Sequence, residues 1–259
     1  MQNTTLQQLL KRDRLPIMLG LVILLAWSWW YTIDMAKMAN ANCPMLAKSA
    51  KAWTPSYFFM MLEMWVVMMM AMMLPSVTPM ILMFASVHHK RRQQQKPFVS
   101  TGFFLAGYLI AWAGFSAVAT ILQWWLQNLS LLSPAMSSTN TILGGVILLC
   151  AGLFQFTSLK RTCLLHCSNP LDFIITNWRE GKGGALIMGL HHGSFCIGCC
   201  WLLMALLFVV GVMNIAWVIL LSIFVLLEKL LKNNNWLRYI AGGFFILWSI
   251  ITMGMFKYF

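Results

Sequence analysis

The sequence has 259 residues, of which 60% are hydrophobic and only 9% are charged, with a mean hydropathy of +0.76. A soluble domain carries roughly a quarter charged residues, so this composition excludes an ordinary soluble protein and predicts an integral membrane protein. The net charge of +12 does not indicate a nucleic-acid partner. Its basic residues lie in short segments between apolar runs, where they orient a membrane protein instead.

Seven apolar runs follow a polar N-terminal segment. Residues 1–14 are expected to form a short cytoplasmic segment at the membrane interface. Most of the runs have the roughly 20 apolar residues that a bilayer core requires, and Pro75 and Pro79 are expected to break or kink the second run. We predict an all-α, polytopic membrane protein whose residues 1–259 form a single domain of seven transmembrane helices. The predicted spans are residues 15–31, 57–74, 98–122, 141–156, 185–212, 215–231 and 236–255.

Lys and Arg are distributed unequally between the two sides of this predicted bundle. Fourteen fall on the side of the N-terminus and four fall on the opposite side. Because Lys and Arg concentrate in cytoplasmic loops, we expect the N-terminus in the cytoplasm and the C-terminus outside. The expected location is the bacterial inner (cytoplasmic) membrane, which the chain would cross several times.

The fifth run contains a concentration of His and Cys residues. His191 and His192 are followed by Cys196, Cys199 and Cys200. On a helix, His192, Cys196 and Cys199 lie within about 60° of one another, with Cys200 beside them. Groups of this kind are usually functional in a membrane span, and they favour a metal or redox site. The alternative is that the thiols only fill a helix interface, as free Cys often does.

A second group of candidate ligands follows the fourth run. Cys163, His166 and Cys167 are spaced so that three soft or borderline ligands fall within one turn. The predicted topology places this loop in the cytoplasm, where thiols stay reduced and available to a metal. A solvated loop with incidental thiols is the alternative.

The second run is rich in methionine. Met64, Met68 and Met72 recur every four residues and therefore share one helix face. Thioether sulfur favours Cu(I), and a series of weak sites lets an ion enter and still leave. The alternative is packing, because Met fills irregular helix interfaces well. Glu63 in the same run is an intramembrane carboxylate, which is expected to be a proton acceptor or a cation partner.

Two further groups of residues are informative. Gly183, Gly184, Gly189 and Gly193 are expected to permit another helix to approach the His/Cys segment closely. Glu228 and Lys229 close the sixth run, where we expect a local ion pair or charged side chains that reach toward the membrane surface. The sequence has no Gly-rich phosphate loop and no Ser/His/Asp hydrolase signature, so a non-enzymatic protein is favoured over an enzyme.

Several segments of the chain match those of a known family of membrane proteins. They are residues 69–76, 163–167, 178–181, 184–193, 196–201, 211–214 and 228–229. Through them the chain resembles the family of predicted metal-binding integral membrane proteins called domain of unknown function 2182. The resemblance implies metal binding by these same Cys and His residues and supplies no mechanism. The first fifty or so residues match the family poorly.

The combination of Met, Cys and His with very few carboxylates favours a soft metal over Mg, Ca or Mn. We therefore predict that the protein binds copper, as Cu(I), with zinc as the alternative metal. It would transport the ion, or deliver it to a membrane cuproenzyme or a metallochaperone. Two other functions remain open: a membrane thiol–disulfide oxidoreductase that uses Cys196 and Cys199 as a C-x-x-C pair, and a non-catalytic assembly subunit.

Overall fold

The computed structural model describes residues 2–40, 53–93, 100–133, 137–231 and 235–255, which are almost entirely helical and contain no strand. The prediction of an all-α protein is therefore confirmed for this part of the chain. The helices are α1 (Gln2–Asn40), α3 (Pro55–Gln93), α4 (Thr101–Asn128), α5 (Thr141–Phe156), α6 (Ser158–Ser168), α7 (Pro170–Asn177), α8 (Gly181–Ala205), α9 (Leu207–Val210), α10 (Ile215–Leu230) and α11 (Trp236–Met255).

Within the described residues, five helical segments are long and apolar enough to cross a membrane. Helices α5 and α6 meet at a 68° bend and make a sixth candidate if they are counted as one span. Helix α10 has only 16 residues, about 24 Å at 1.5 Å per residue, so it is short for a bilayer core. The described chain thus supports five or six crossings, and the seventh stays a prediction. The five segments are Leu15–Ala39, Pro55–Val87, Thr101–Asn128, Gly181–Val210 and Trp236–Gly254.

The second predicted span is longer than expected and is not ended by its prolines. Helix α3 is assigned without interruption through Pro75 and Pro79. The hydroxyl groups of Ser76 and Thr78 donate to backbone carbonyls within this stretch, at 2.9 and 2.8 Å. Such side-chain hydrogen bonds help a membrane helix to tolerate proline. The N-terminal segment is likewise continuous with its span, because α1 begins at Gln2.

The segment after the fourth span is helical, so its prediction as a loop was wrong. Helix α6 begins after Thr157, whose hydroxyl accepts a hydrogen bond from the backbone N–H of Lys160. Helix α7 begins at Pro170. Proline is favoured in the first turn of a helix, because the backbone N–H that it lacks would have no partner within the helix there. The helical winding of α6 turns Cys167 into the interior and leaves His166 exposed.

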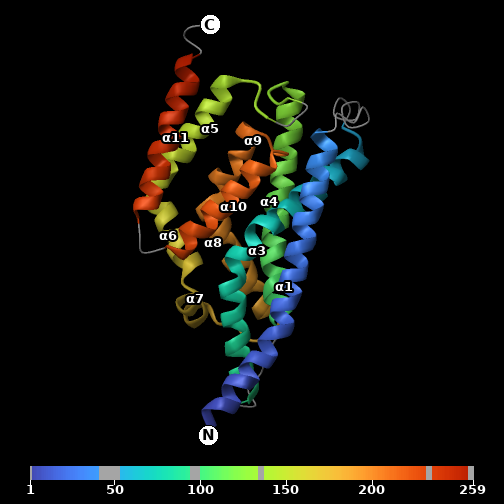
Figure 1. The fold of residues 1–259 in the computed structure, drawn as a ribbon, viewed down its shortest axis with the longest axis vertical. Helices are drawn as coiled ribbons and strands as arrows, with labels where there is room; N and C mark the ends of the chain where they lie inside the picture. The colour runs from blue at the N-terminus through green and yellow to red at the C-terminus, as the bar shows by residue number, and fades with distance from the viewer. Residues whose placement is uncertain (1, 41–52, 94–99, 134–136, 232–234, 256–259) are drawn as a thin grey trace.

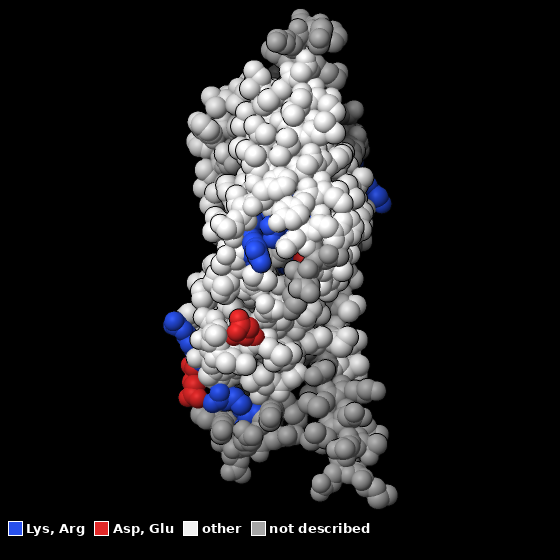
Figure 2. Space-filling view, turned by 90° about the vertical axis from the view of Figure 1, so that its left-hand side faces the viewer, with Lys and Arg blue, Asp and Glu red and all other residues white. Residues whose placement is uncertain are grey.

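The helices form an elongated bundle in which α1, α3, α4 and α8 run along the long axis (Figure 1). Helices α5 and α11 pair beside its upper half, α10 lies among the others, and α6 and α7 lie lower down. On the face shown in Figure 2, charged side chains are concentrated from mid-height downward. The upper part of that face is white except for one basic side chain at its edge. This face therefore has a mostly apolar upper part and a charged lower part.

Helices α4 and α8 approach each other closely at glycine residues, as predicted for Gly189 and Gly193. The prediction was wrong for Gly183, which has nothing within 4 Å of an added Cβ, and for Gly184, which lies against Arg179 and not against another helix. A Cβ atom on Gly189 would overlap the backbone carbonyl of Phe104, and one on Gly107 would overlap the carbonyl of Leu186. A Cβ on Gly193 would lie 2.6 Å from the Cβ of Ala111. The two backbones are thus nearly in contact, and this fixes α4 against the His/Cys face of α8.

Substitution of Gly189 by Ala tests this contact. We expect Gly189→Ala to lower the free energy of unfolding by ~1–3 kcal/mol, because the added methyl group meets backbone that cannot rotate away. Gly114→Ala on α4 is the matched control, since nothing lies within 4 Å of its added Cβ. The control should be unchanged or more stable by up to about 1 kcal/mol, from helix propensity alone. Unfolding of the purified proteins in detergent measures both, and equal stabilities would contradict the close contact.

Candidate metal site

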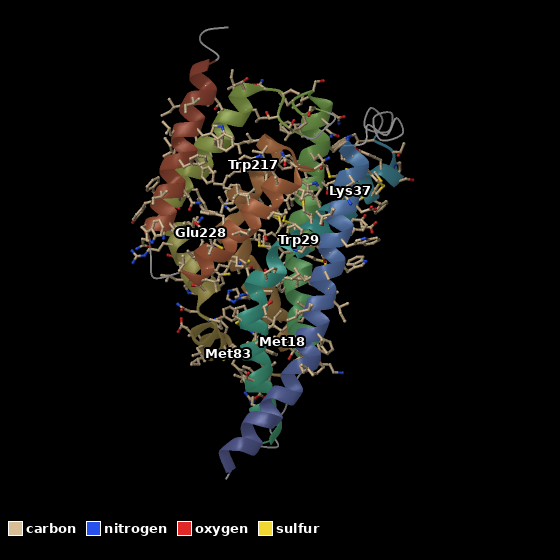
Figure 3. The ribbon with its side chains drawn as sticks, in the orientation of Figure 1. Met18, Trp29, Lys37, Met83, Trp217 and Glu228 are labelled. Carbon is tan, nitrogen blue, oxygen red and sulfur yellow. The ribbon has the colours of Figure 1, made fainter. Side chains whose placement is uncertain are left out.

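Four cysteine thiols from two helices meet in the interior of the bundle. Cys196, Cys199 and Cys200 lie on the buried face of α8, each at most 2% exposed. Cys167 of α6 is also buried, and its thiol interacts with those of Cys196 and Cys199. Sulfur atoms appear in yellow among the helices at about mid-height in Figure 3. The structure therefore brings together two cysteine groups that are about 30 residues apart, and we call these four residues the thiol cluster.

A lysine side chain reaches into the thiol cluster from α10. The ammonium nitrogen of Lys229 lies 2.9 Å from the sulfur of Cys196 and 2.8 Å from the hydroxyl of Ser76 on α3. Among the described residues, Lys229 forms no salt bridge with a carboxylate. The local ion pair expected between Glu228 and Lys229 was therefore wrong, because Glu228 pairs with Lys160. A buried ammonium group needs a partner, and the Cys196 sulfur is the closest soft acceptor.

A tyrosine completes the surroundings of Cys196. The hydroxyl of Tyr108 on α4 lies 3.3 Å from the Cys196 sulfur and 3.4 Å from the carbonyl of Met73. Tyr108 follows Gly107, so the close contact between α4 and α8 places its hydroxyl beside the Cys196 thiol. Sequence reasoning missed Tyr108, which lies in an apolar run that contains no Cys, His or charged residue. It also missed Lys229, although an ionisable residue in the last turn of an apolar run was a usable signal.

His192 lies inside the bundle next to the thiol cluster. Its side chain is buried, and its ring centroid is 6.0 Å from that of Tyr108 and 5.1 Å from that of Phe173. In the described part of the chain, the Nδ1 atom of His192 is buried and has no hydrogen-bond partner. A buried polar atom without a partner is uncommon. This nitrogen is therefore a donor atom that the fold leaves available.

The other two predicted imidazoles lie on the surface. His166 and His191 are both exposed, and the ring of each lies 4.8 Å from the ring of Phe195. The Nδ1 atom of His166 is also 2.9 Å from the carbonyl of Thr162. The predicted set of ligands is thus divided between a buried group and a surface group.

The remaining predicted residues are not members of the thiol cluster. Cys163 is partly exposed and packs beside Gly198, where an added Cβ would be 3.1 Å from its sulfur. Glu63 is exposed and hydrogen-bonds with Tyr31 of α1, so it faces away from the core. The methionine stripe is buried throughout the core. Its predicted ligands Met64, Met68 and Met72 are at most 3% exposed.

The thiol cluster is not arranged as a ready-made metal site. In the described part of the chain, no group of three or more His, Cys, Asp or Glu residues has the geometry to hold a metal ion. The thiols of Cys199 and Cys200 instead donate to the carbonyl of Cys196, at 3.1 and 2.9 Å, and Lys229 lies beside the Cys196 sulfur. A metal ion would replace these contacts. The donor atoms themselves, sulfur and imidazole nitrogen, are those that Cu(I) prefers.

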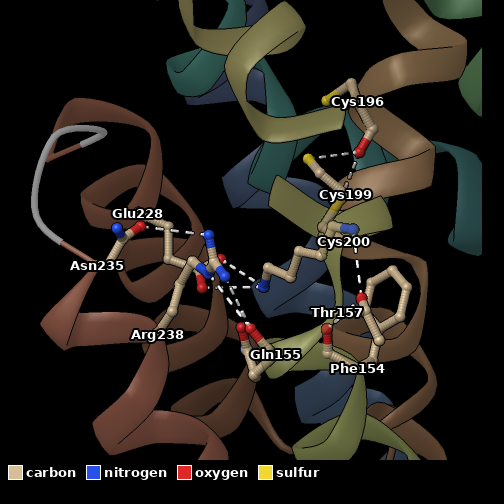
Figure 4. Close-up of polar contacts among 10 residues, drawn as sticks. Phe154, Gln155, Thr157, Cys196, Cys199, Cys200, Glu228, Asn235 and Arg238 are labelled. Carbon is tan, nitrogen blue, oxygen red and sulfur yellow. Dashed lines mark hydrogen bonds and ion pairs between the residues drawn. The ribbon is translucent and has the colours of Figure 1, made fainter. Parts of the chain in front are cut away.

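A buried polar network fixes the helices that carry the cluster (Figure 4). The ammonium group of Lys160 on α6 donates to both carboxylate oxygens of Glu228 on α10, at 2.9 Å each. The guanidinium of Arg238 on α11 donates to the carbonyl of Gln155, near the end of α5, at 3.3 and 3.2 Å. The network therefore ties α6, which carries Cys167, to α10, which carries Lys229.

The Lys160–Glu228 pair can be tested by a double-mutant cycle. We expect Lys160→Met alone to lower the free energy of unfolding by ~3–5 kcal/mol, because it leaves a buried carboxylate without a partner. The double variant Lys160→Met/Glu228→Leu should recover much of this loss, since neither charge remains. Unfolding in detergent provides the measurement. Losses that simply add would show that the two side chains do not depend on each other.

Comparison with known protein families identifies a match over most of the chain. The PpoB2 family, described as copper chaperone, matches residues 62–252. No curated protein and no solved structure matches the chain. The matched region begins within α3 and includes the whole of the thiol cluster, Lys229 and Tyr108. Because it covers well over half of the sequence, the chain belongs to the PpoB2 family of copper chaperones.

Proposed function

We propose that the protein binds Cu(I) at the thiol cluster and passes it on within the membrane. The observation that carries this proposal is the meeting of Cys167 with Cys196 and Cys199 in the interior, beside the unpartnered Nδ1 of His192. Thiolate and imidazole ligands select Cu(I) over hard cations. Membership in a copper chaperone family supports copper over zinc as the metal.

We further propose a membrane location in which the lower, charged ends of the helices face the cytoplasm. Support comes from the unequal distribution of Lys and Arg in the sequence and from the mostly uncharged upper part of the face shown in Figure 2. Three basic side chains, those of Lys160, Lys229 and Arg238, are buried and have structural partners. In this arrangement α5 and α6 together form one bent span, and α10 forms a short span. The protein would deliver Cu(I) to a membrane cuproenzyme or a metallochaperone.

In this proposal the methionine stripe is the path along which Cu(I) reaches the thiol cluster. Met64, Met68 and Met72 cover about 12 Å of α3 at 1.5 Å per residue, and the stripe ends one turn before Ser76. Ser76 touches Lys229, which touches Cys196. Weak thioether sites in series would let Cu(I) move along α3 toward the stronger thiol ligands.

A thiol–disulfide oxidoreductase is the second candidate, because the Lys229 ammonium group next to Cys196 is a setting that favours a thiolate. An enzyme of this kind must present its thiol to a partner, whereas Cys196 and Cys199 are at most 2% exposed. Trapping of free thiols in intact cells distinguishes the two functions. A redox enzyme should be found partly oxidised at these two residues, and a copper carrier should be found reduced.

Replacement of Cys196 tests the copper site directly. We expect purified wild-type protein to bind Cu(I), and Cys196→Ser to bind it at least about 100-fold more weakly, a loss of ~2.8 kcal/mol, because a hydroxyl is a poor ligand for a soft ion. Cys150→Ser is the matched control, since Cys150 is exposed on α5. Competition with a coloured Cu(I) chelator measures the affinities. Negligible copper in the wild type, or equal affinities in all three proteins, would refute the proposal.

The methionine path is tested by replacing Met64, Met68 and Met72 together with Leu. Leu has a similar volume, so we expect the cost to be below about 1.5 kcal/mol for each substitution. Affinity at the thiol cluster should be unchanged, whereas uptake of Cu(I) into vesicles should slow roughly tenfold, equivalent to ~1.4 kcal/mol in the barrier. Unchanged uptake by a stable variant would assign the stripe to packing alone.

A further inference from the structure

A cavity of about 420 Å³ lies where α3, the junction of α6 and α7, and the end of α10 come together. It is bounded by the proline-containing turn of α3 and by Ser168, Leu226 and Leu230. Leu230 is 60% exposed, so the cavity reaches the surface. Cys167 and Lys229 also line it, but they are only 5% and 7% exposed and form its inner end. The cavity therefore connects the surface with the thiol cluster.

Among the four thiols, only that of Cys167 lines the cavity. Cys199 and Cys200 lie behind it and point toward the carbonyl of Cys196. Cys196 itself is fully buried, and Lys229 lies against its sulfur. A solute that enters from the surface would meet Cys167 and Lys229 first and would reach Cys196 through them.

The charge of the cavity indicates what kind of solute it accepts. Among the described residues that line it, Lys229 is the one with a charge, and the other polar lining groups are the Cys167 thiol and the hydroxyls of Ser76, Thr78 and Ser168. An ammonium group in such a poorly hydrated setting attracts an anion more strongly than it would in water. The volume is in the range of small-molecule sites, roughly 300–1,000 Å³. A compact anionic complex that contains Cu(I) fits both the charge and the volume of the cavity.

We propose that this cavity is the port through which Cu(I) is exchanged with the thiol cluster, as the anionic complex of Cu(I) with two thiolates of a small soluble thiol. The proposal rests on the proposed copper function and adds the chemical form of the cargo and its route. It assigns Cys167 as the first protein ligand and Lys229 as the group that attracts the complex.

The exchange is a ligand substitution in which no electron is transferred. Two copper–sulfur bonds to the small thiolates break, and copper–sulfur bonds to Cys167 and Cys196 form. The proton of the Cys167 thiol passes to one departing thiolate, which leaves as a neutral thiol, and the other departs as a thiolate. Cys196 enters the exchange as a thiolate, so the total charge is conserved. The ammonium group of Lys229 remains beside the new anionic copper centre.

Alkylation of Cys167 tests the port without copper. The full-length protein is prepared with Cys43, Cys150 and Cys163 replaced by Ser, which leaves only the thiol cluster, and is treated with a small water-soluble maleimide. Cys167 should react at least about ten times faster than the other three thiols, a rate ratio equivalent to ~1.4 kcal/mol. Mass spectrometry of the digested protein identifies the modified residue. Equal reaction of Cys167 and Cys199 would overturn the proposal.

Bulky substitutions at the wall of the cavity test the route of copper. We expect Leu226→Trp and Ser168→Trp each to slow both Cys167 alkylation and Cu(I) loading from a Cu(I)–cysteine complex at least about tenfold, with the final copper content unchanged. Ile223→Trp is the matched control, one turn away on α10 and 50% exposed, and should leave both rates unchanged.

The two wall positions lie on different helices, so either variant decides the question if the other does not fold. Full rates in a folded wall variant would overturn the port. Absence of copper from the wild type would instead refute the proposed function, and the alkylation rates would still decide whether the cavity is the way in.

Discussion

The constraint on which the site depends is the burial of an ammonium group in an apolar interior. Lys229 is 7% exposed, and its nearest polar neighbours are a thiol and a hydroxyl. Burial of a charge without a partner costs more free energy than the net free energy of unfolding of a typical domain. The helices around Lys229 must therefore hold Cys196 and Ser76 within reach of its nitrogen. This single requirement joins α3, α8 and α10 at the thiol cluster.

The position of Lys229 follows from the geometry of α10. Glu228 and Lys229 are consecutive, and consecutive residues on a helix point about 100° apart, so they cannot pair with each other. Glu228 instead reaches Lys160 of α6, while Lys229 reaches Cys196 of α8. One turn of α10 therefore fixes both helices that supply thiols. The arrangement makes the site sensitive to any displacement of α10.

The contact between α4 and α8 sets the other side of the site. Gly107 and Gly189 let the two backbones meet, and this brings the hydroxyl of Tyr108 to the Cys196 sulfur. Cys196 is consequently surrounded by a phenol, an ammonium group and neighbouring thiols. Helix α1 takes no part in this arrangement, and the match to the copper chaperone family begins only after it, at residue 62. The region shared with the family thus begins within α3.

The sequence by itself determined the helical class, most helix positions and the buried face of α8, because these depend on local hydropathy and on the 3.6-residue repeat. It predicted that His192, Cys196, Cys199 and Cys200 share a face, and all four are buried. Only the tertiary structure decided which helices adjoin. It turned Cys167 inward and His191 outward, and it paired Lys229 with a residue 33 positions away. A periodic pattern shows which face of a helix is buried but not what that face contacts, since the partner depends on packing between segments distant in the chain.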